Sequence, residues 1–464
     1  MFISWIGIVS LFIILFLCFK LSFKQIYSYF IIASIIFMLF INVGTMITLP
    51  FMKISYYEFF LYCLYLMSIY IFWKYGISKK ELQILMIWVI IILINIGLLI
   101  LFPSHIKTVT LPNLWYDYFN HGIEQMAVIS KYTFIYSFYF FMLPIMMFAI
   151  HKLYTKKELY NLYCLLKKST LIFVPIILLE IIIKLCFGID YFYYIRDFLF
   201  GINSDTVSEI MRGNLISFFG FCTEPASLAS SLLLTGLLHF TFKNSLKHDA
   251  LLLLIIYIAG FMTGSMIFLV YAFLLIVFFI YKHIIDISIV LKKIKVIYIV
   301  LFTIIIFMLC IFNQDIILYF VNRIINIASI ITGNDVSYNS ESVRILSSVN
   351  MFYCFLSRPF FGVGIATAYS FSSLLSLLSN FGMVGALGII YFIKCFCGNL
   401  SLKSVGTNMI LIIISIFFLL QGSINNFVFP IFFMILFIID NENKNHSFVV
   451  DLSETKESSL ENDQ

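Results

Sequence analysis

Long apolar runs separated by shorter polar segments dominate the pattern along this chain. Most runs last roughly 17–25 residues, the length that an α-helix needs to cross about 30 Å of hydrocarbon. They lack the strict alternation of apolar and polar residues that is typical of outer-membrane barrel strands. The pattern predicts an all-α polytopic membrane protein with about 12–13 transmembrane helices and two large extracytoplasmic loops. The predicted spans are residues 2–19, 26–48, 55–73, 82–102, 132–150, 169–188, 226–242, 250–264, 266–281, 296–312, 381–398, 408–422 and 427–440.

Residues 250–281 decide the sidedness of every later segment. We predict two short helices with a break at Thr263, Gly264 and Ser265, and the alternative is one long tilted helix. With the break, the lysine-rich loops all fall on one side, which the positive-inside rule assigns to the cytoplasm. The N-terminus then faces out and the C-terminus faces in. The main lysines of these loops are Lys74, Lys79, Lys80, Lys152, Lys156, Lys157, Lys167, Lys168, Lys243, Lys247, Lys282, Lys292, Lys293, Lys295, Lys394 and Lys403.

Three longer polar segments are predicted on the outside, near residues 103–131, 189–225 and 313–380. A function is expected there, because the rest of residues 1–440 forms a single apolar bundle. The tail, residues 441–464, is polar and acid-rich with few apolar anchors, so we expect a disordered cytoplasmic segment.

Composition excludes the soluble classes. The chain of 464 residues is 62% hydrophobic and only 11% charged, whereas soluble domains have about 25% charged residues. The net charge of +6 does not indicate a nucleic-acid partner, because the lysines lie in short loops where they orient the chain in the membrane. The nine cysteines show neither metal-ligand spacing nor a secreted disulfide pattern, so we expect them to be small packing residues.

The arginines are distributed differently from the lysines. All five fall in the second or third outside segment, where the positive-inside rule would not place them. Arginine differs from lysine in its planar set of donors, which binds phosphate or carboxylate with two hydrogen bonds. The distribution predicts an extracytoplasmic anion site. The alternative for each arginine is a loop residue that pairs with an acid or reaches lipid headgroups. The five are Arg196, Arg212, Arg323, Arg344 and Arg358.

The stretch 211–231 brings a charged loop directly onto a predicted membrane helix. Pro225 suits the first turn of a helix, so we expect the helix to begin there with Glu224 at its cap. A plain capping role for Thr223 or Glu224 is the alternative. In the preceding span, Glu180 and Lys184 stand four residues apart on one helix face, which favours a mutually neutralised structural pair.

The third outside segment is predicted to contain an amphipathic helix over residues 340–357, ended by Pro359. Arg344 and Arg358 would lie near one face of it but about 21 Å apart along the axis, too far to bind one phosphate together. Gly362 and Gly364 follow the proline. Their spacing permits either a phosphate-binding loop or a plain turn between helices.

Four short motifs together resemble the Wzy-type O-antigen and capsule repeat-unit polymerases, which form one superfamily with the O-antigen ligases. The resemblance covers roughly Arg212 to Gly388. The motifs are TEPASLA at 223–229, SVR at 342–344, SRPFFGVGIA at 357–366 and NFGMVGALG at 380–388.

The resemblance implies an enzyme of the bacterial cytoplasmic (inner) membrane with its site on the periplasmic face. It would transfer a growing glycan from undecaprenyl pyrophosphate to a carrier-linked repeat unit, without metal or nucleotide. Arg212, Glu224 and Arg344 would be catalytic. Substrate binding would involve Arg323, Arg358, Gly362 and Gly364. The implied partners are the undecaprenyl-pyrophosphate-linked oligosaccharide, membrane lipid and a chain-length regulator protein.

Two other functions stay open at this point. A ligase of the superfamily is expected to carry a histidine in the large outside loop, and residues 313–380 contain none. A flippase of lipid-linked oligosaccharides needs charge inside a cavity that opens to both faces. Arginines that line a through-cavity would favour the flippase, whereas arginines over an outside pocket would favour the enzyme.

Overall fold

The computed structural model covers the whole chain. It describes residues 2–41, 44–49, 52–108, 125–127, 129–187, 198–199, 211–212, 215–216, 225–240, 246–283, 340–368 and 372–397, with single positions at 218, 220, 222, 321, 322, 325 and 329. The described part is mostly helical, as predicted, and divides into two compact units. Unit 1 comprises Met1–Lys20, Ile35–Phe59 and Lys167–Val336, and unit 2 comprises Leu21–Ser34, Phe60–Leu166 and Ser337–Gln464.

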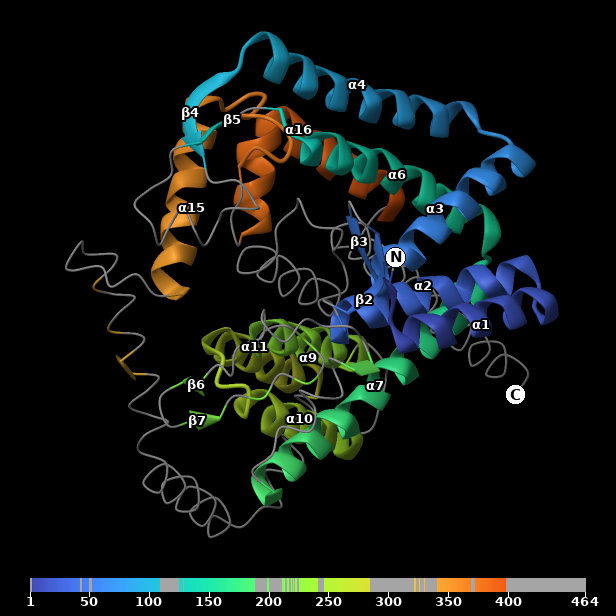
Figure 1. Cartoon of the computed structure of the whole chain (residues 1–464), viewed down its shortest axis with the longest axis vertical. Coiled ribbons are helices and arrows are strands. Elements are labelled where there is room, and N and C mark those ends of the chain that lie inside the picture. The colour runs from blue at the N-terminus through green and yellow to red at the C-terminus, as the bar shows by residue number, and fades with distance from the viewer. Residues whose placement is uncertain are drawn as a thin grey trace, which may run out of the picture. The chain divides into compact units, whose positions relative to one another are not determined.

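Eleven helices and seven short strands make up the described elements (Figure 1). The helices are α1 (Trp5–Lys20), α2 (Phe23–Phe40), α3 (Tyr56–Tyr75), α4 (Lys79–Leu101), α6 (Lys131–Leu153), α7 (Lys156–Phe187), α9 (Pro225–Phe240), α10 (Leu246–Phe261), α11 (Met266–Lys282), α15 (Ser340–Ser357) and α16 (Ser373–Cys397). The strands are β1 (Phe2–Ile3), β2 (Thr45–Leu49), β3 (Met52–Ser55), β4 (Ser104–Thr108), β5 (Gln125–Ala127), β6 (Met211–Arg212) and β7 (Leu215–Ile216).

Three of the described helices are long and apolar enough to cross a membrane, namely α2, α4 and residues 132–153 of α6. Shorter apolar helices occur at α1, α9, α11 and the first part of α16. The predicted spans 296–312, 408–422 and 427–440 lie outside the described residues.

In unit 1 the break within residues 250–281 is confirmed. α10 ends at Phe261, a turn follows, and α11 begins at Met266 and packs back against α10. The far ends of the hairpin meet at Asp249, whose buried carboxylate accepts from Lys282 Nζ at 2.5 Å and His283 Nε2 at 2.9 Å. One long tilted helix would have separated these groups, so the structure favours the split.

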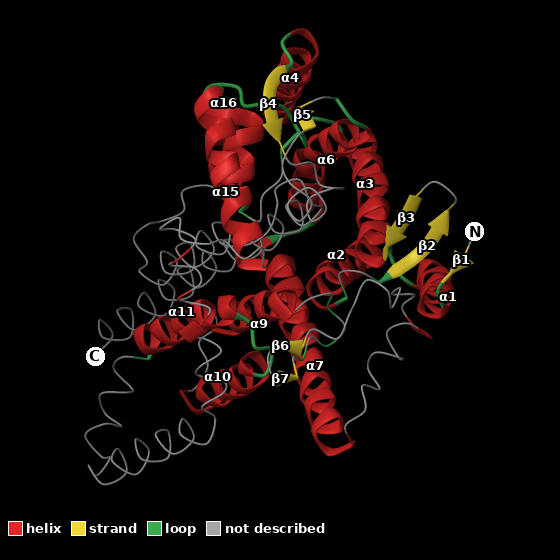
Figure 2. Ribbon diagram, turned by 60° about the vertical axis from the view of Figure 1, so that its left-hand side comes forward, coloured by secondary structure: helices red, strands yellow, loops and turns green. Residues whose placement is uncertain are grey.

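In unit 2, α4 packs against both α6 and α16, and α15 packs against α16 and β4 (Figure 2). Trp88 of α4 donates from its indole to the carbonyl of Phe140 in α6. Phe140 also meets Phe381 of α16 edge to face, with ring centroids 4.7 Å apart. These aromatic contacts bury the inner faces of helices whose other faces are apolar and exposed.

The predicted span 26–48 is wrong at its C-terminal end. α2 stops at Phe40, and residues 45–49 form β2, the central strand of an antiparallel sheet with the order β1-β2-β3. Thr45, Ile47 and Thr48 are β-branched and favour a strand. β2 pairs with β1 and β3, so its backbone groups are bonded without a helix. The local sequence pattern does not reveal this pairing of strands, so it could not predict where α2 ends.

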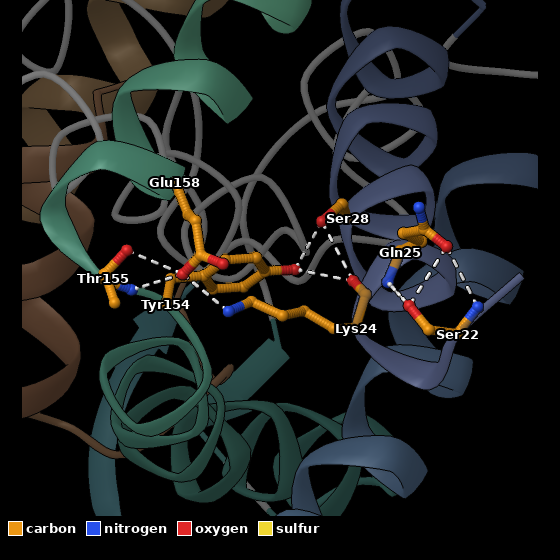
Figure 3. Close-up of polar contacts among 7 residues, drawn as sticks. All are labelled: Ser22, Lys24, Gln25, Ser28, Tyr154, Thr155 and Glu158. Atoms are coloured by element: carbon orange, nitrogen blue, oxygen red, sulfur yellow. Dashed lines mark hydrogen bonds and ion pairs between the residues drawn. The ribbon is translucent and has the colours of Figure 1, made fainter.

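The predicted cytoplasmic loop 151–168 is also largely helical. α6 ends at Leu153, and α7 begins only three residues later at Lys156. The side chain of Glu158 accepts from the backbone N–H of Thr155 at 2.8 Å and from its hydroxyl at 2.7 Å, an arrangement that caps a helix. Lys24 Nζ lies 2.6 Å from the same carboxylate (Figure 3). This contact ties the start of α2 to the turn between α6 and α7.

Candidate functional site

The segment that contains Arg212 forms a short antiparallel hairpin in unit 1. β6 pairs with β7, and Arg212 is the last residue of its strand, opposite Leu215. Glu224 and Arg323 lie outside the described residues. Arg212 therefore has a defined backbone position, and the catalytic roles of Arg212 and Glu224 stay predictions.

Pro225 is the first residue of α9, which confirms the predicted start of that helix. α9 is buried along nearly its whole length and packs against α10 and α11. The hydroxyl of Ser231 donates to the carbonyl of Leu39, at the end of α2. The thiol of Cys222 contacts the carbonyls of Leu39 and Phe40 at 3.5 and 3.6 Å. The small residues at the start of α9 thus allow close packing against a helix terminus.

Glu180 and Lys184 of α7 contact the segment that precedes TEPASLA. Glu180 Oε2 accepts from the backbone N–H of Gly220 at 2.7 Å. Lys184 Nζ lies 5.6 Å from the centroid of the Phe218 ring. Both side chains are buried, with 1% and 8% of their surface exposed. The N–H of Phe218 donates in turn to the carbonyl of Met262, which follows α10.

These contacts give the two charges a role that the sequence analysis missed. The sequence predicts a mutually neutralised pair of Glu180 and Lys184, and that pairing stays a prediction. The structure adds a hydrogen bond from the Gly220 N–H to Glu180 and a contact of Lys184 with the Phe218 ring. A buried carboxylate that accepts a backbone hydrogen bond fixes that backbone, because breaking the bond leaves a charge poorly solvated. An ionisable residue inside an apolar span is a candidate functional residue by default. By that criterion the sequence alone already marks Glu180 and Lys184.

Helix α15 of unit 2 has the predicted bounds, residues 340–357, and contains Arg344. Arg344 is half-buried, and its carbonyl accepts from the hydroxyls of Ser347 and Ser348 at 3.0 and 2.8 Å. Farther along the helix, Met351 and Cys354 pack in a buried cluster with Val363. Burial raises the pKa of the Cys354 thiol to about 11, so this cysteine stays protonated at neutral pH and is a poor nucleophile.

The guanidinium of Arg358 donates to two backbone carbonyls just beyond α4. Nη1 lies 2.6 Å from the carbonyl oxygen of Phe102, and Nη2 lies 3.2 Å from that of Pro103. Both carbonyls belong to residues that follow α4, which ends at Leu101. The side chain of Arg358, which was predicted to bind substrate, therefore makes a structural contact with the segment that leaves α4.

The turn at Gly362 and Gly364 packs closely against α16 just before Gly382 and against Leu99 of α4. A Cβ at Gly362 would lie 2.5 Å from backbone atoms of Ser379 and Asn380, and one at Gly364 would lie 2.9 Å from Leu99. The amides of Val363 and Gly364 donate to the carbonyls of Ser379 and Asn380 at 2.7 and 3.2 Å. These amides already have acceptors within the protein, which favours the plain turn over a phosphate-binding loop.

Two asparagines hold this turn in place. Asn95 of α4 donates from Nδ2 to the carbonyls of Phe361 and Asn380 and accepts from the N–H of Ile365 at 2.7 Å. The side chain of Asn380 bonds to both backbone groups of Ala368. Both asparagines are buried. Asn95 was not among the predicted site residues, although a single amide side chain within an apolar span is a recognisable signal.

The predicted site residues thus fall in two groups. Arg344, Arg358, Gly362 and Gly364 belong to unit 2, and Arg212 belongs to unit 1 with Glu180 and Lys184. Within the described residues, no group of three or more His, Cys, Asp or Glu side chains could hold a metal ion. In comparisons with known proteins, no protein-family model matches this chain, and no curated protein matches it.

Proposed function

We propose that this chain is a polytopic polymerase of the bacterial cytoplasmic membrane. It joins oligosaccharide repeat units linked to undecaprenyl pyrophosphate, on the outer face, in the synthesis of an O-antigen or a capsule. In this proposal residues 1–440 form one bundle of about 12–13 spans, with the arginines of the two large loops outside. A chain-length regulator protein is a further proposed partner.

One observation supports the proposal most strongly. The segment before TEPASLA is bound by two buried charges of an apolar helix, Glu180 to Gly220 and Lys184 to Phe218. Charges inside a membrane helix cost several kcal/mol unless they are paired, so they are retained where position matters. Phe218 and Gly220, which shortly precede Glu224 in the sequence, are thereby held against α7, as a site for oriented substrates requires.

The proposed reaction is a substitution at the anomeric carbon of the donor glycan. The acceptor hydroxyl oxygen forms the new glycosidic bond while the bond to the pyrophosphate oxygen breaks, and the hydroxyl proton passes to a nearby acceptor or to water. Pyrophosphate leaves with at least two negative charges, so fixed cationic donors lower the barrier. Arg212 and Arg344 are proposed to supply them through paired hydrogen bonds.

Glu224 is proposed to orient the acceptor hydroxyl. Pro225 is the first residue of α9, and in this proposal Glu224, which precedes it in the sequence, occupies the capping position, where a helix N-terminus would stabilise the charged carboxylate. A stabilised carboxylate is a weak base, so it accepts a hydrogen bond from the sugar hydroxyl more readily than it removes the proton. Arg323 is a proposed substrate contact, whereas Gly362 and Gly364 form a turn and Arg358 holds the segment that follows α4.

A flippase is the second candidate, because transporters also keep charges within their membrane helices, as this chain does at Glu180 and Lys184. Chemistry distinguishes the two functions directly. The purified chain, incubated with the lipid-linked repeat unit from its own gene neighbourhood, should produce a ladder of longer glycans on a gel. A flippase would move the substrate across a vesicle membrane and leave its length unchanged, and that result would contradict the polymerase.

Glu224→Gln tests the proposed role of the carboxylate in the same assay. The amide keeps the shape and part of the acceptor capacity but loses the charge, so we expect normal membrane abundance with reduced chain formation. Normal polymer from Glu224→Gln would leave Glu224 as a helix cap only.

A further inference from the structure

A pocket with basic side chains lies between the first turn of α4 and the last turns of α6, in unit 2. Its volume is about 260 Å³, and its lining residues are Ser78, Lys80, Glu81, Ile84, Phe148, His151 and Lys152. None of these residues belongs to the proposed polymerase site. The proposed polymerase activity therefore does not explain what this pocket binds.

The polar part of the pocket is organised around one carboxylate. Glu81 accepts from the backbone N–H of Ser78 at 2.8 Å, as part of a capping box at the start of α4. Lys152 of α6 reaches across and places its Nζ 2.8 Å from Glu81 Oε2. Lys80 and His151 line the same pocket, so its two lysines outnumber its one carboxylate and an anion is favoured.

The inner part of the pocket is apolar. Ile84 and Phe148 lie one or two turns deeper along α4 and α6, and both are buried. A ligand that fits this arrangement combines an anionic head with an apolar body. A small hydrophilic anion would satisfy the lysines but leave the apolar part without a partner.

The position of the pocket specifies the ligand further. α4 and α6 are two of the described helices that are long and apolar enough to cross a membrane, and the pocket joins their ends. The ends of membrane-spanning helices lie at headgroup depth. By the lysine distribution, these ends face the cytoplasm. Basic pockets between helix ends on that face suit anionic lipid headgroups.

We propose that this pocket binds the phosphate headgroup of an anionic glycerophospholipid in the cytoplasmic leaflet. The ammonium groups of Lys80 and Lys152 contact the phosphate oxygens, and the first methylene groups of the acyl chains lie against Ile84 and Phe148. Glu81 keeps Lys152 across the pocket entrance. The site does not depend on the proposed polymerase activity.

The test uses the full chain purified in a neutral detergent, with bound lipid counted by native mass spectrometry and with the midpoint of thermal unfolding as a second measurement. The probe is short-chain phosphatidylglycerol, and the comparison ligands are short-chain phosphatidylcholine, glycerol 3-phosphate and inorganic phosphate. We expect saturable binding of phosphatidylglycerol with a raised midpoint. Equal binding of phosphatidylcholine, or equal stabilisation by inorganic phosphate or glycerol 3-phosphate, would overturn the proposal.

Lys80→Gln and Lys79→Gln form a matched pair. The two lysines are neighbours in the first turn of α4 and lose the same charge, but only Lys80 lines the pocket. Lys80→Gln should weaken phosphatidylglycerol binding about tenfold, as expected for the loss of one charge-assisted hydrogen bond. Lys79→Gln should leave binding nearly unchanged. Equal losses in both variants would mean general attraction to a basic surface and would contradict a defined site.

Discussion

The side chain of Arg358 illustrates what an arginine contributes that a lysine does not. Its two Nη atoms donate to two different carbonyls, of Phe102 and Pro103. A single ammonium group on a flexible stem cannot reproduce that geometry. By the same reasoning, we expect Arg212 and Arg344 each to bind two oxygen atoms of the pyrophosphate. Replacing each by lysine tests this, because lysine keeps the positive charge but lacks the planar pair of donors.

Replacing Arg212 or Arg344 by lysine should lower the rate of chain formation roughly tenfold to a hundredfold. A hydrogen bond to a charged group is worth about 1.5–3 kcal/mol, and about 1.4 kcal/mol in the barrier is a tenfold change in rate. The rate is measured from the glycan ladder at equal membrane abundance of each variant.

Arg196→Lys is the matched control for these two variants. Its segment is rich in Tyr and Phe and is predicted to lie at headgroup depth, where charge and reach suffice. We therefore expect near-normal activity. If Arg212→Lys and Arg344→Lys also show near-normal activity, the distribution of the arginines is no evidence for an anion site.

Gly382 is the residue at which α16 is kinked. Its φ of 66° and ψ of −169° interrupt α16, in a region that essentially only glycine occupies. A Cβ there would lie 2.4 Å from backbone atoms of Phe360. Gly382→Ala should therefore cost at least about 1–3 kcal/mol of stability, visible as a lowered midpoint of thermal unfolding in detergent.

Gly97 provides the comparison for Gly382. It lies within α4, and a Cβ there would meet nothing within 4 Å. Gly97→Ala should raise stability by roughly 0.5–1 kcal/mol, because alanine loses less conformational freedom in a helix. If Gly382→Ala and Gly97→Ala lose similar stability, the backbone conformation at Gly382 is not the cause of the lowered unfolding midpoint.

At the scale of elements, the predictions that succeeded depend on local signals. Pro225 at the start of α9, the turn at Thr263–Ser265 and the bounds of α15 follow from residues within a few positions of each boundary. The C-terminal end of α2 was predicted wrongly, because it depends on pairing of β2 with β1 and β3. The bond from Glu180 to Gly220 spans forty positions, and periodicity contains no information on such a contact.

The start of α7 gives a test of an element through pH. The ion pair with Lys24 and two hydrogen bonds from Thr155 lower the pKa of Glu158 from 4.5 to about 2. A lowered pKa stabilises the folded state fully above pH 4.5, and the stabilisation is lost as the pH falls towards 2. The midpoint of thermal unfolding of the wild type should fall through this window more steeply than that of Glu158→Gln.

Salt provides the control for that pH effect. The side chains of Lys24 and Glu158 are 35% and 40% accessible to solvent, so added salt should screen their pair and shrink the difference between wild type and Glu158→Gln. Gln cannot titrate but keeps an oxygen that accepts from Thr155. Identical pH profiles of the two proteins at low salt would mean that the cap at Thr155 does not depend on the charge.

At the scale of the whole molecule, the orientation of α4 in the membrane decides on which side the loop of Arg358 lies. α4 has 23 residues, about 34 Å of helix, enough to place its two ends on opposite sides of a membrane. Glu81 near its first end contacts Lys152, and Arg358 binds carbonyls just beyond its last residue. The lysine distribution assigns the first end to the cytoplasm, so the loop of Arg358 is predicted outside.

Cysteines introduced one at a time at Ile77 and Phe360 test this assignment. Both side chains are exposed, at 49% and 61%, and they lie near opposite ends of α4. In spheroplasts of a Cys186→Ser background, which removes an exposed native thiol, a membrane-impermeant maleimide should label Phe360→Cys well above background and leave Ile77→Cys unlabelled. Both should react after permeabilisation, because only the membrane protects Ile77→Cys. Labelling of Ile77→Cys alone in intact spheroplasts would invert the topology, move the arginines to the cytoplasm and remove the basis for an extracytoplasmic polymerase.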